Sequence, residues 1–262
     1  MFVKSRALLF LFTILSATRV MAGTVVEFSI VGEGIDERQT AFIQDGLIYV
    51  ENAGGLRDTD LLFDAGKSSV VMINHDERNY YTLDESEIDS LTQLAASVAT
   101  TMENQREVLS DILGTFGLGG ILEEAKPESE TPADKRLENT GQQMTVSGLR
   151  CHLYRIWRRG RLDTELCIAG QDEFPIPAND YDTLEGLYQF GDKVFGLIGE
   201  LLTRLGVPIP MLGSDQLNGL PVFINSHKEG LRTFVDRIQE TEVDASRFRI
   251  PRGYESTIFP LG

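Results

Sequence analysis

The chain has 262 residues, of which 42% are hydrophobic, so it can bury a substantial core as one elaborated domain or two small ones. Its 24 Lys and Arg residues stand against 40 Asp and Glu residues, which gives a formal charge of −16 at pH 7. This acidity argues against nucleic acid and anionic lipid surfaces as partners.

The N-terminus has the order of regions that is typical of a secretory signal peptide. Lys4 and Arg6 precede an apolar run, and Ala22 ends a small-residue cleavage site. The apolar run is shorter than the roughly 20 residues that cross a bilayer, and no cysteine lies nearby to accept a lipid. We therefore expect residues 1–22 to be removed, and the mature protein to be periplasmic, soluble and without a transmembrane segment.

The first part of the mature chain predicts an antiparallel meander. Residues 24–32 are rich in β-branched side chains, and Asp45-Gly46 lies between two apolar runs as a hairpin turn would. Turn-forming residues at 64–67 and 75–78 then divide three further short strands.

A different pattern follows the meander. Apolar residues recur at helical spacing over 86–113, with Asp84 or Ser86 able to cap the start, which predicts an amphipathic helix against the sheet. Residues 117–139 are rich in Gly, Pro, Glu and Lys, and predict a flexible acidic linker.

The only two cysteines, Cys151 and Cys167, lie in one predicted hairpin. In an oxidising compartment such a pair is usually a disulfide. A three-residue loop at 158–160 would place the two cysteines opposite each other, and the same register would pair Arg155 with Asp163.

Two other roles for the cysteines are weaker. A metal site is disfavoured because His152 follows Cys151 directly on a strand and so points to the opposite face. A thioredoxin-like redox centre would need two cysteines separated by two residues. We expect the Cys151–Cys167 disulfide to be a structural staple.

A second amphipathic helix is predicted over residues 183–205. Gly191, Gly196 and Gly199 lower its intrinsic helicity, so it needs tertiary packing or a partner. Its broad apolar face belongs either to the core or to the roof of a cavity for a hydrophobic ligand. The residues of that face which are candidates for ligand binding are Leu187, Tyr188, Val194, Phe195, Ile198, Leu201 and Leu202.

The C-terminal part predicts a hairpin around residues 226–230, and it carries a family resemblance. The segments NGLPVFINSHKEG and FRIPRGYE resemble an exported bacterial family known only as a domain of unknown function. Together with paired aromatics such as Tyr80-Tyr81, the order of elements also resembles that of lipoprotein-carrier-like half-barrels. The residues that carry the C-terminal resemblance are Gly219, Pro221, Phe248, Ile250, Pro251, Gly253 and Tyr254.

The resemblance implies an α+β fold, in which helices pack on the concave face of a curved antiparallel β-sheet, a half-barrel. In such carriers this face holds acyl chains or other hydrophobic ligands. The resemblance implies no catalytic residues. We expect residues 23–262 to form one such domain, interrupted by the linker.

No motif in the sequence indicates catalysis. The chain lacks a nucleophile elbow, a His-Glu-x-x-His helix and a dinucleotide-binding glycine fingerprint. His75 and His227 lie in predicted turns, and Asp58, Asp60 and Asp64 do not follow calcium-loop spacing. We therefore expect a protein without enzymatic activity, cofactor or metal.

A glycosidase-like carboxylate pair stays open in a chain this acidic, but two other functions are favoured over it. The first is an exported binding protein that holds a lipid or other hydrophobic molecule in a half-barrel cavity. The second is a protein-interaction or envelope-regulatory module with a collapsed cavity and an exported protein partner. Saturable binding of a hydrophobic dye would distinguish them, because only an open cavity takes up the dye.

Overall fold

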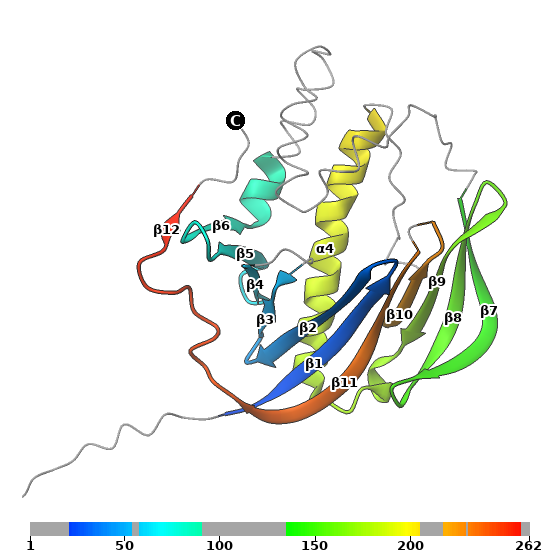
Figure 1. Ribbon diagram of the computed structural model, residues 1–262, viewed down its shortest axis with the longest axis horizontal. Coiled ribbons are helices and arrows are strands. Elements are labelled where there is room, and N and C mark those ends of the chain that lie inside the picture. Colours follow the sequence, from blue (N-terminus) through cyan, green and yellow to red (C-terminus); the bar gives the residue numbers. More distant parts are fainter. Residues whose placement is uncertain (1–20, 54–57, 91–134, 205–216, 229, 258–262) are drawn as a thin grey trace, which may run out of the picture.

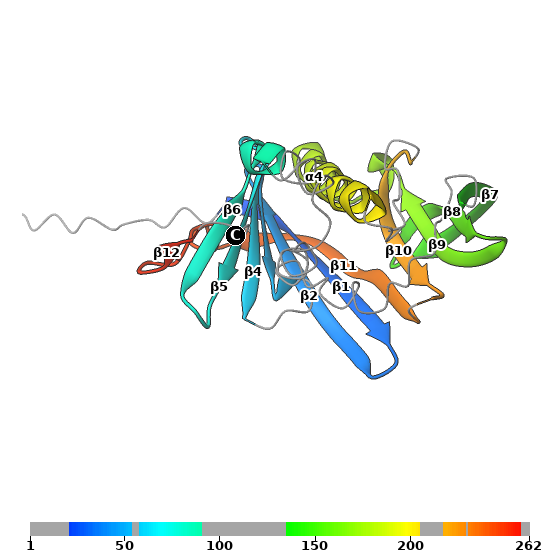
Figure 2. The ribbon, with the colours of Figure 1, turned by 90° about the horizontal axis from the view of Figure 1, so that it is seen from above.

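The computed structural model describes residues 21–53, 58–90, 135–204, 217–228 and 230–257. Within these residues, twelve strands form a single sheet in the order β12-β6-β5-β4-β3-β2-β1-β11-β10-β9-β8-β7. The sheet is large, curved and unclosed, and it dominates the fold (Figures 1 and 2). All neighbouring strands are antiparallel except the short β12, which lies parallel to β6.

The first half of the sheet is the predicted meander. Asp45 and Gly46 have φ angles of 51° and 79°, the left-handed pair that a two-residue hairpin turn requires. The strands of this half are β1 (Met21–Gly32), β2 (Ile35–Gln44), β3 (Leu47–Glu51), β4 (Thr59–Asp64), β5 (Ser69–Asn74) and β6 (Asn79–Leu83).

The second half is another meander, and it joins the first through a long-range pair of strands. β11 lies between β10 and β1, so strands from the two ends of the chain complete one sheet. The strands of this half are β7 (Lys135–Val146), β8 (Leu149–Arg158), β9 (Arg161–Ala169), β10 (Leu220–Ser226) and β11 (Leu231–Val243), and β12 (Glu255–Ser256) follows at the opposite edge.

The start of the predicted linker is outside the described residues, but its end was predicted wrongly. Lys135 to Asn139 form the first part of β7 and pair with residues 154–158 of β8. Their charged composition is compatible with a strand because β7 is at the edge of the sheet, where Lys, Arg and Glu are common. Leu137 is the apolar exception, and it packs against a buried cluster that contains Ile156.

The helix predicted over 86–113 begins as expected, and residues 91–113 lie outside the described part. Residues 85–90 are helical, and the carboxylate of Asp84 accepts hydrogen bonds from the backbone N–H groups of Ser86 and Glu87 at 2.9 and 3.1 Å. The bond from Glu87 is the largest cause of the lowered pKa of Asp84. Asp84 is therefore the N-cap.

The second predicted helix is α4 (Ala178–Arg204), which starts five residues before the predicted position. A single 3-10 turn, η3 (Gln171–Glu173), precedes it. Figure 2 shows α4 lying over one face of the sheet.

Three hydrophobic clusters share the two faces of the sheet. Since neighbouring residues of a strand point to opposite faces, Val26 and Phe63 belong to the main core cluster on the α4 side, whereas Val25 and Leu62 belong to a second cluster. Phe248 of the C-terminal segment covers this second cluster. The third cluster contains Ile156 of β8, Leu166 and Ile168 of β9, and Leu217, which precedes β10.

Candidate functional site

The first half of α4 is packed into the main core cluster. The ring of Phe190 lies 5.9 Å from that of Phe63 on β4, measured between centroids. Tyr181 and Val194 are also buried in this cluster. These contacts hold the helix against the sheet through aromatic and aliphatic surface.

A buried polar pair fixes the start of the helix. Thr24 on β1 donates a hydrogen bond of 2.6 Å from its hydroxyl to the carboxylate of Asp180, and both side chains are buried. Because an acidic side chain in the first turn also interacts favourably with the positive end of the helix dipole, Asp180 is tolerated in this position. The pair sets where α4 begins relative to β1.

The predicted ligand-binding residues fall into two groups. Leu187 and Tyr188 are half-buried and pack against the main core cluster, and Val194 is fully buried. Burial is the main cause of the raised pKa of Tyr188, with a smaller contribution from Asp192. Phe195, Ile198, Leu201 and Leu202 belong to α4, but their side chains lie outside the described part.

The predicted disulfide between Cys151 and Cys167 is confirmed, and both residues are buried in the main core cluster. The predicted register is wrong by two residues, because Cys167 lies opposite Leu153. The turn has two residues, since Arg159 and Gly160 both adopt left-handed φ angles, of 48° and 72°. A bulge between residues 156 and 157 adds the remaining shift.

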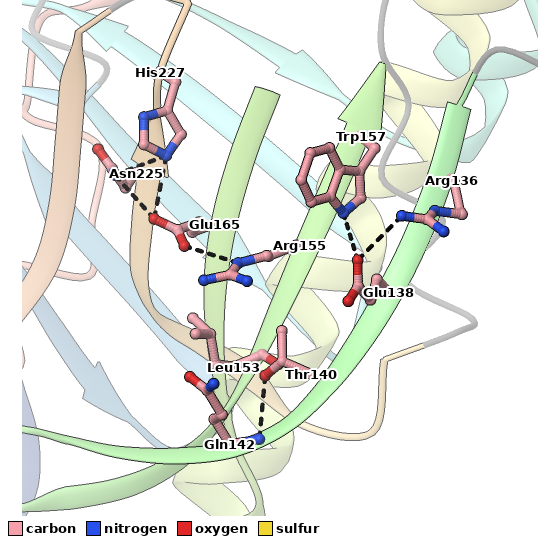
Figure 3. Close-up of polar contacts among 10 residues, drawn as sticks. All are labelled: Arg136, Glu138, Thr140, Gln142, Leu153, Arg155, Trp157, Glu165, Asn225 and His227. Carbon is pink, nitrogen blue, oxygen red and sulfur yellow. Dashed lines mark hydrogen bonds and ion pairs between the residues drawn. The ribbon is translucent and has the colours of Figure 1, made fainter. Parts of the chain in front are cut away.

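Between the disulfide and the β8–β9 turn, polar side chains lie on the same face of β8 and β9 as the two cysteines. Figure 3 shows these polar side chains and their contacts. Arg155 donates from Nε to Oε1 of Glu165 at 3.1 Å, and the amide of Asn225 donates to Oε2 at 3.4 Å. Nε2 of His227 lies 3.1 Å from the same Oε2. Burial raises the pKa of Glu165, but the hydrogen bonds from Arg155, His227 and Asn225 outweigh it and leave the pKa lowered.

A second polar group lies beside the first, on β7 and β8. Trp157 donates from its indole Nε1 to Glu138 at 2.6 Å, and Arg136 lies 3.2 Å from the same carboxylate and over the Trp157 ring (Figure 3). We call the combined set the polar ledge. It consists of Arg136, Glu138, Arg155, Trp157, Glu165, Asn225 and His227.

The salt bridges of this hairpin differ from the predicted pair. Arg155 binds Glu165, and Asp163 is bound by Arg158 at 3.1 Å instead. The first change follows from the two-residue turn together with the bulge, because the resulting register sets Arg155 opposite Glu165. The three-residue loop was predicted from the left-handed preference of Gly160. That preference does not indicate that Arg159 also adopts a left-handed φ angle, which shortens the turn to two residues.

A third polar cluster attaches the C-terminal segment to the opposite face of the sheet. Nε2 of His75 lies 2.5 Å from Oδ2 of Asp60, and its Nδ1 lies 2.8 Å from the hydroxyl of Tyr254. Tyr49 also donates to Asp60, and burial is the main cause of its raised pKa. Sequence reasoning missed this cluster because its members are brought together only by the sheet and the C-terminal segment.

No group of three or more His, Cys, Asp or Glu side chains suited to a metal ion occurs among the described residues. In the same part of the chain, no helix has the length and apolar character that a membrane crossing requires.

The chain matches no protein-family model and no curated protein. Among solved structures it is similar to an uncharacterized conserved protein from Thermus thermophilus, at 9% identity and a TM-score of 0.38, over 92% of each chain. It is also similar to PNGF-II, at 9% identity and a TM-score of 0.39, over 91% of this chain and 31% of that one. A third similarity is to the Pseudomonas aeruginosa MucA/MucB complex, at 8% identity and a TM-score of 0.32, over 88% of this chain and 56% of that one. Scores this low support no inference about function.

Proposed function

We propose that this protein is an exported, non-enzymatic binding protein that holds a hydrophobic or amphipathic molecule between α4 and the concave face of a half-barrel sheet. The observation that carries the proposal is the partial burial of Leu187 and Tyr188, which lie on the sheet side of α4 yet keep apolar surface accessible beside the main core cluster. Ligand sites are lined mainly by hydrophobic and aromatic side chains, which is the chemistry that these two residues offer beside the sheet.

The disulfide supports the proposed compartment. A buried Cys151–Cys167 bond persists in oxidising environments and is rare where thiols are kept reduced. It agrees with the signal-peptide pattern of residues 1–22, which remains an expectation from sequence.

The second candidate is a protein-interaction module whose cavity is collapsed. The burial of Phe190 and Val194 favours it, since these side chains already fill the space between α4 and the sheet. In this case α4 is a core helix, and recognition takes place on the outer surface.

Native mass spectrometry of the mature protein purified from its own compartment tests the first candidate. We expect a stoichiometric bound species that dissociates on unfolding and is recovered as lipid by organic extraction. A clean apo mass, together with no saturable uptake of a hydrophobic dye, would reject the ligand-binding proposal in favour of the interaction module.

A matched pair of helix variants locates the site. Tyr188→Ala removes half-buried apolar surface, so it should weaken dye or lipid binding by several-fold while the protein still unfolds cooperatively. Gln189→Ala changes an exposed residue of the same turn and should leave binding unchanged. Equal binding by the two variants would place the ligand elsewhere.

A further inference from the structure

Three side chains of different chemistry converge on one point of the sheet face opposite α4. Tyr49 of β3 donates from its hydroxyl to Oδ2 of Asp60 on β4, and Nε2 of His75 lies 2.5 Å from the same oxygen. Since a carboxylate oxygen accepts, His75 carries a proton on Nε2 in this arrangement. A phenol oxygen, a carboxylate oxygen and an imidazole nitrogen therefore meet within hydrogen-bonding distance.

The backbone fixes these side chains. β3 and β4 are adjacent antiparallel strands, and the backbone N–H of His75 donates to the carbonyl of Asp58 at 2.8 Å, just before β4 begins. The second carboxylate oxygen of Asp60 accepts from the backbone N–H of Asn52 at 3.1 Å. Asp60 is thereby held with Oδ2 toward Tyr49 and His75.

The C-terminal segment orients the imidazole from its other side. Figure 1 shows the segment between β11 and β12 passing the first half of the sheet on its way to β6. Nδ1 of His75 lies 2.8 Å from the hydroxyl of Tyr254, and the two rings meet edge to face with their centroids 5.7 Å apart. Histidines that bind metal ions almost always have their second nitrogen held by a hydrogen-bonding partner. A hydroxyl both donates and accepts, so Tyr254 satisfies Nδ1 in either tautomer of the ring.

An ion can reach this cluster from solvent. The side chain of His75 is 32% exposed, and that of Asp60 is 11% exposed. The neighbouring Glu51 and Arg247 form an ion pair with each other, so the local charge is left to Asp60. The chain as a whole has a formal charge of −16 at pH 7, and its field attracts cations.

The ligand types favour a small cation of high charge. Imidazole suits iron, copper, zinc and nickel, whereas Mg²⁺ and Ca²⁺ prefer sites made of oxygen alone. A phenol keeps its proton at neutral pH, so the ion must displace that proton, and a trivalent ion does this better than a divalent one. Ferric iron is trivalent and takes tyrosine as well as histidine ligands. Among the described residues no three His, Cys, Asp or Glu side chains form a metal-binding group, so here the phenol of Tyr49 is the ligand that completes the set.

We propose that Tyr49, Asp60 and His75 form a binding site for ferric iron, and that Tyr254 positions His75 for it. The ion takes the place of the two hydrogen-bonding protons. Tyr49 releases its hydroxyl proton to solvent, and His75 binds through Nε2 as the neutral tautomer whose Nδ1–H donates to Tyr254. The three ligand atoms then lie further apart than they do as hydrogen-bonded partners, which the partly exposed ring of His75 allows. This site is independent of the proposed ligand between α4 and the sheet.

Titration of the full mature protein with Fe(III), supplied as its citrate complex, tests the proposal. We expect one ion per chain and a visible absorption band from phenolate-to-iron charge transfer, which iron on surface carboxylates does not produce. Binding should raise the midpoint of unfolding, because the site exists only in the folded protein. It should also slow hydrogen exchange in the C-terminal segment, since Tyr254 is attached to the site.

Three tyrosine variants separate the roles of the phenols. Tyr49→Phe keeps the ring but removes the ligand, so it should abolish the absorption band. Tyr254→Phe should keep the band and weaken iron binding by about 10- to 100-fold, the usual cost of losing the partner of a metal-binding histidine. Tyr154→Phe changes a half-buried tyrosine in the other half of the sheet and should leave both unchanged. Circular dichroism checks that each variant is folded.

His75→Gln provides a second test at a more exposed position, in case Tyr49→Phe does not fold. It should weaken iron binding at least as much as Tyr254→Phe does, since it removes a ligand and not only its partner.

Four results would overturn the proposal. No band at saturating iron would leave the cluster as a hydrogen-bond network only, and an undiminished band in Tyr49→Phe would place the iron at another tyrosine. Unchanged affinity in His75→Gln would remove the histidine from the site. Tyr49-dependent binding of Zn(II) without binding of Fe(III) would reject the choice of ion.

Discussion

Cys167 is bonded to Cys151 although its direct partner across the β8–β9 ladder is Leu153. The disulfide therefore joins diagonal neighbours of one sheet face, with their Cα atoms 5.3 Å apart. The right-handed twist of a strand pair brings one of its two diagonals closer together. Both sulfur atoms lie in the main core cluster, so the bond links the hairpin to the face that α4 covers.

Removing the disulfide should destabilise the protein by about 3 kcal/mol, the chain-entropy value for a loop of this size. The double variant Cys151→Ala, Cys167→Ala isolates this effect in denaturant unfolding, and reduction of the wild type should approach the same midpoint. Mass analysis of the exported protein under non-reducing conditions should find the bridged peptide and no free thiol. Two alkylatable thiols would contradict the prediction.

Phe190 should be a core residue of α4. Replacing it with alanine removes the contact with Phe63 and leaves a cavity, which typically costs about 3–5 kcal/mol in the free energy of unfolding. Gln189→Ala, at the exposed neighbouring position, should change the free energy of unfolding by less than about 0.5 kcal/mol. If the two variants proved equally stable, α4 would not be packed on the sheet as described.

Gly219 should not tolerate a side chain. Its φ angle is +131°, and a Cβ atom there would lie 2.3 Å from the carbonyl oxygen of Ala169. Gly219→Ala should therefore cost at least the roughly 1–3 kcal/mol of a strained backbone, and more if the β9–β10 pairing shifts. Gly170→Ala is the control, because a Cβ atom there meets no atom within 4 Å.

Glu165 should make stability depend on pH in the acid range. Its pKa is lowered in the folded protein from an ordinary value of 4.5, so its contribution is complete above that value and is lost as pH falls through the lower folded pKa. The difference in unfolding free energy between wild type and Glu165→Gln should be constant near neutral pH and shrink below about pH 4.5. If the difference in unfolding free energy between the two proteins did not change with pH, the lowered pKa of Glu165 in the folded protein would be contradicted.

A control for that titration is Glu85→Gln, since the Glu85 carboxylate is on the exposed surface in an ion pair with Lys193. Such exposed pairs contribute about 0–1 kcal/mol, so this variant should follow the wild type throughout.

The sequence by itself determined the local elements of this protein. Three of them depend only on residues close in the chain: the Asp45-Gly46 turn, the cap at Asp84 and the apolar side of α4. The disulfide could be predicted because each of the two cysteines has a single possible partner. Turn residues restrict φ wherever they occur, and periodic apolar residues define one face of a helix before it packs on anything.

Only the tertiary structure decided how these elements meet. Residues 135–139 have the composition of a linker, but they are a strand because β8 supplies their hydrogen-bond partners. His227 lies in a turn, as predicted, but only the β9–β10 pairing places its ring beside Glu165. The physical reason is that such pairings join segments far apart in the chain, and their energy comes from backbone and side-chain contacts that no local pattern encodes.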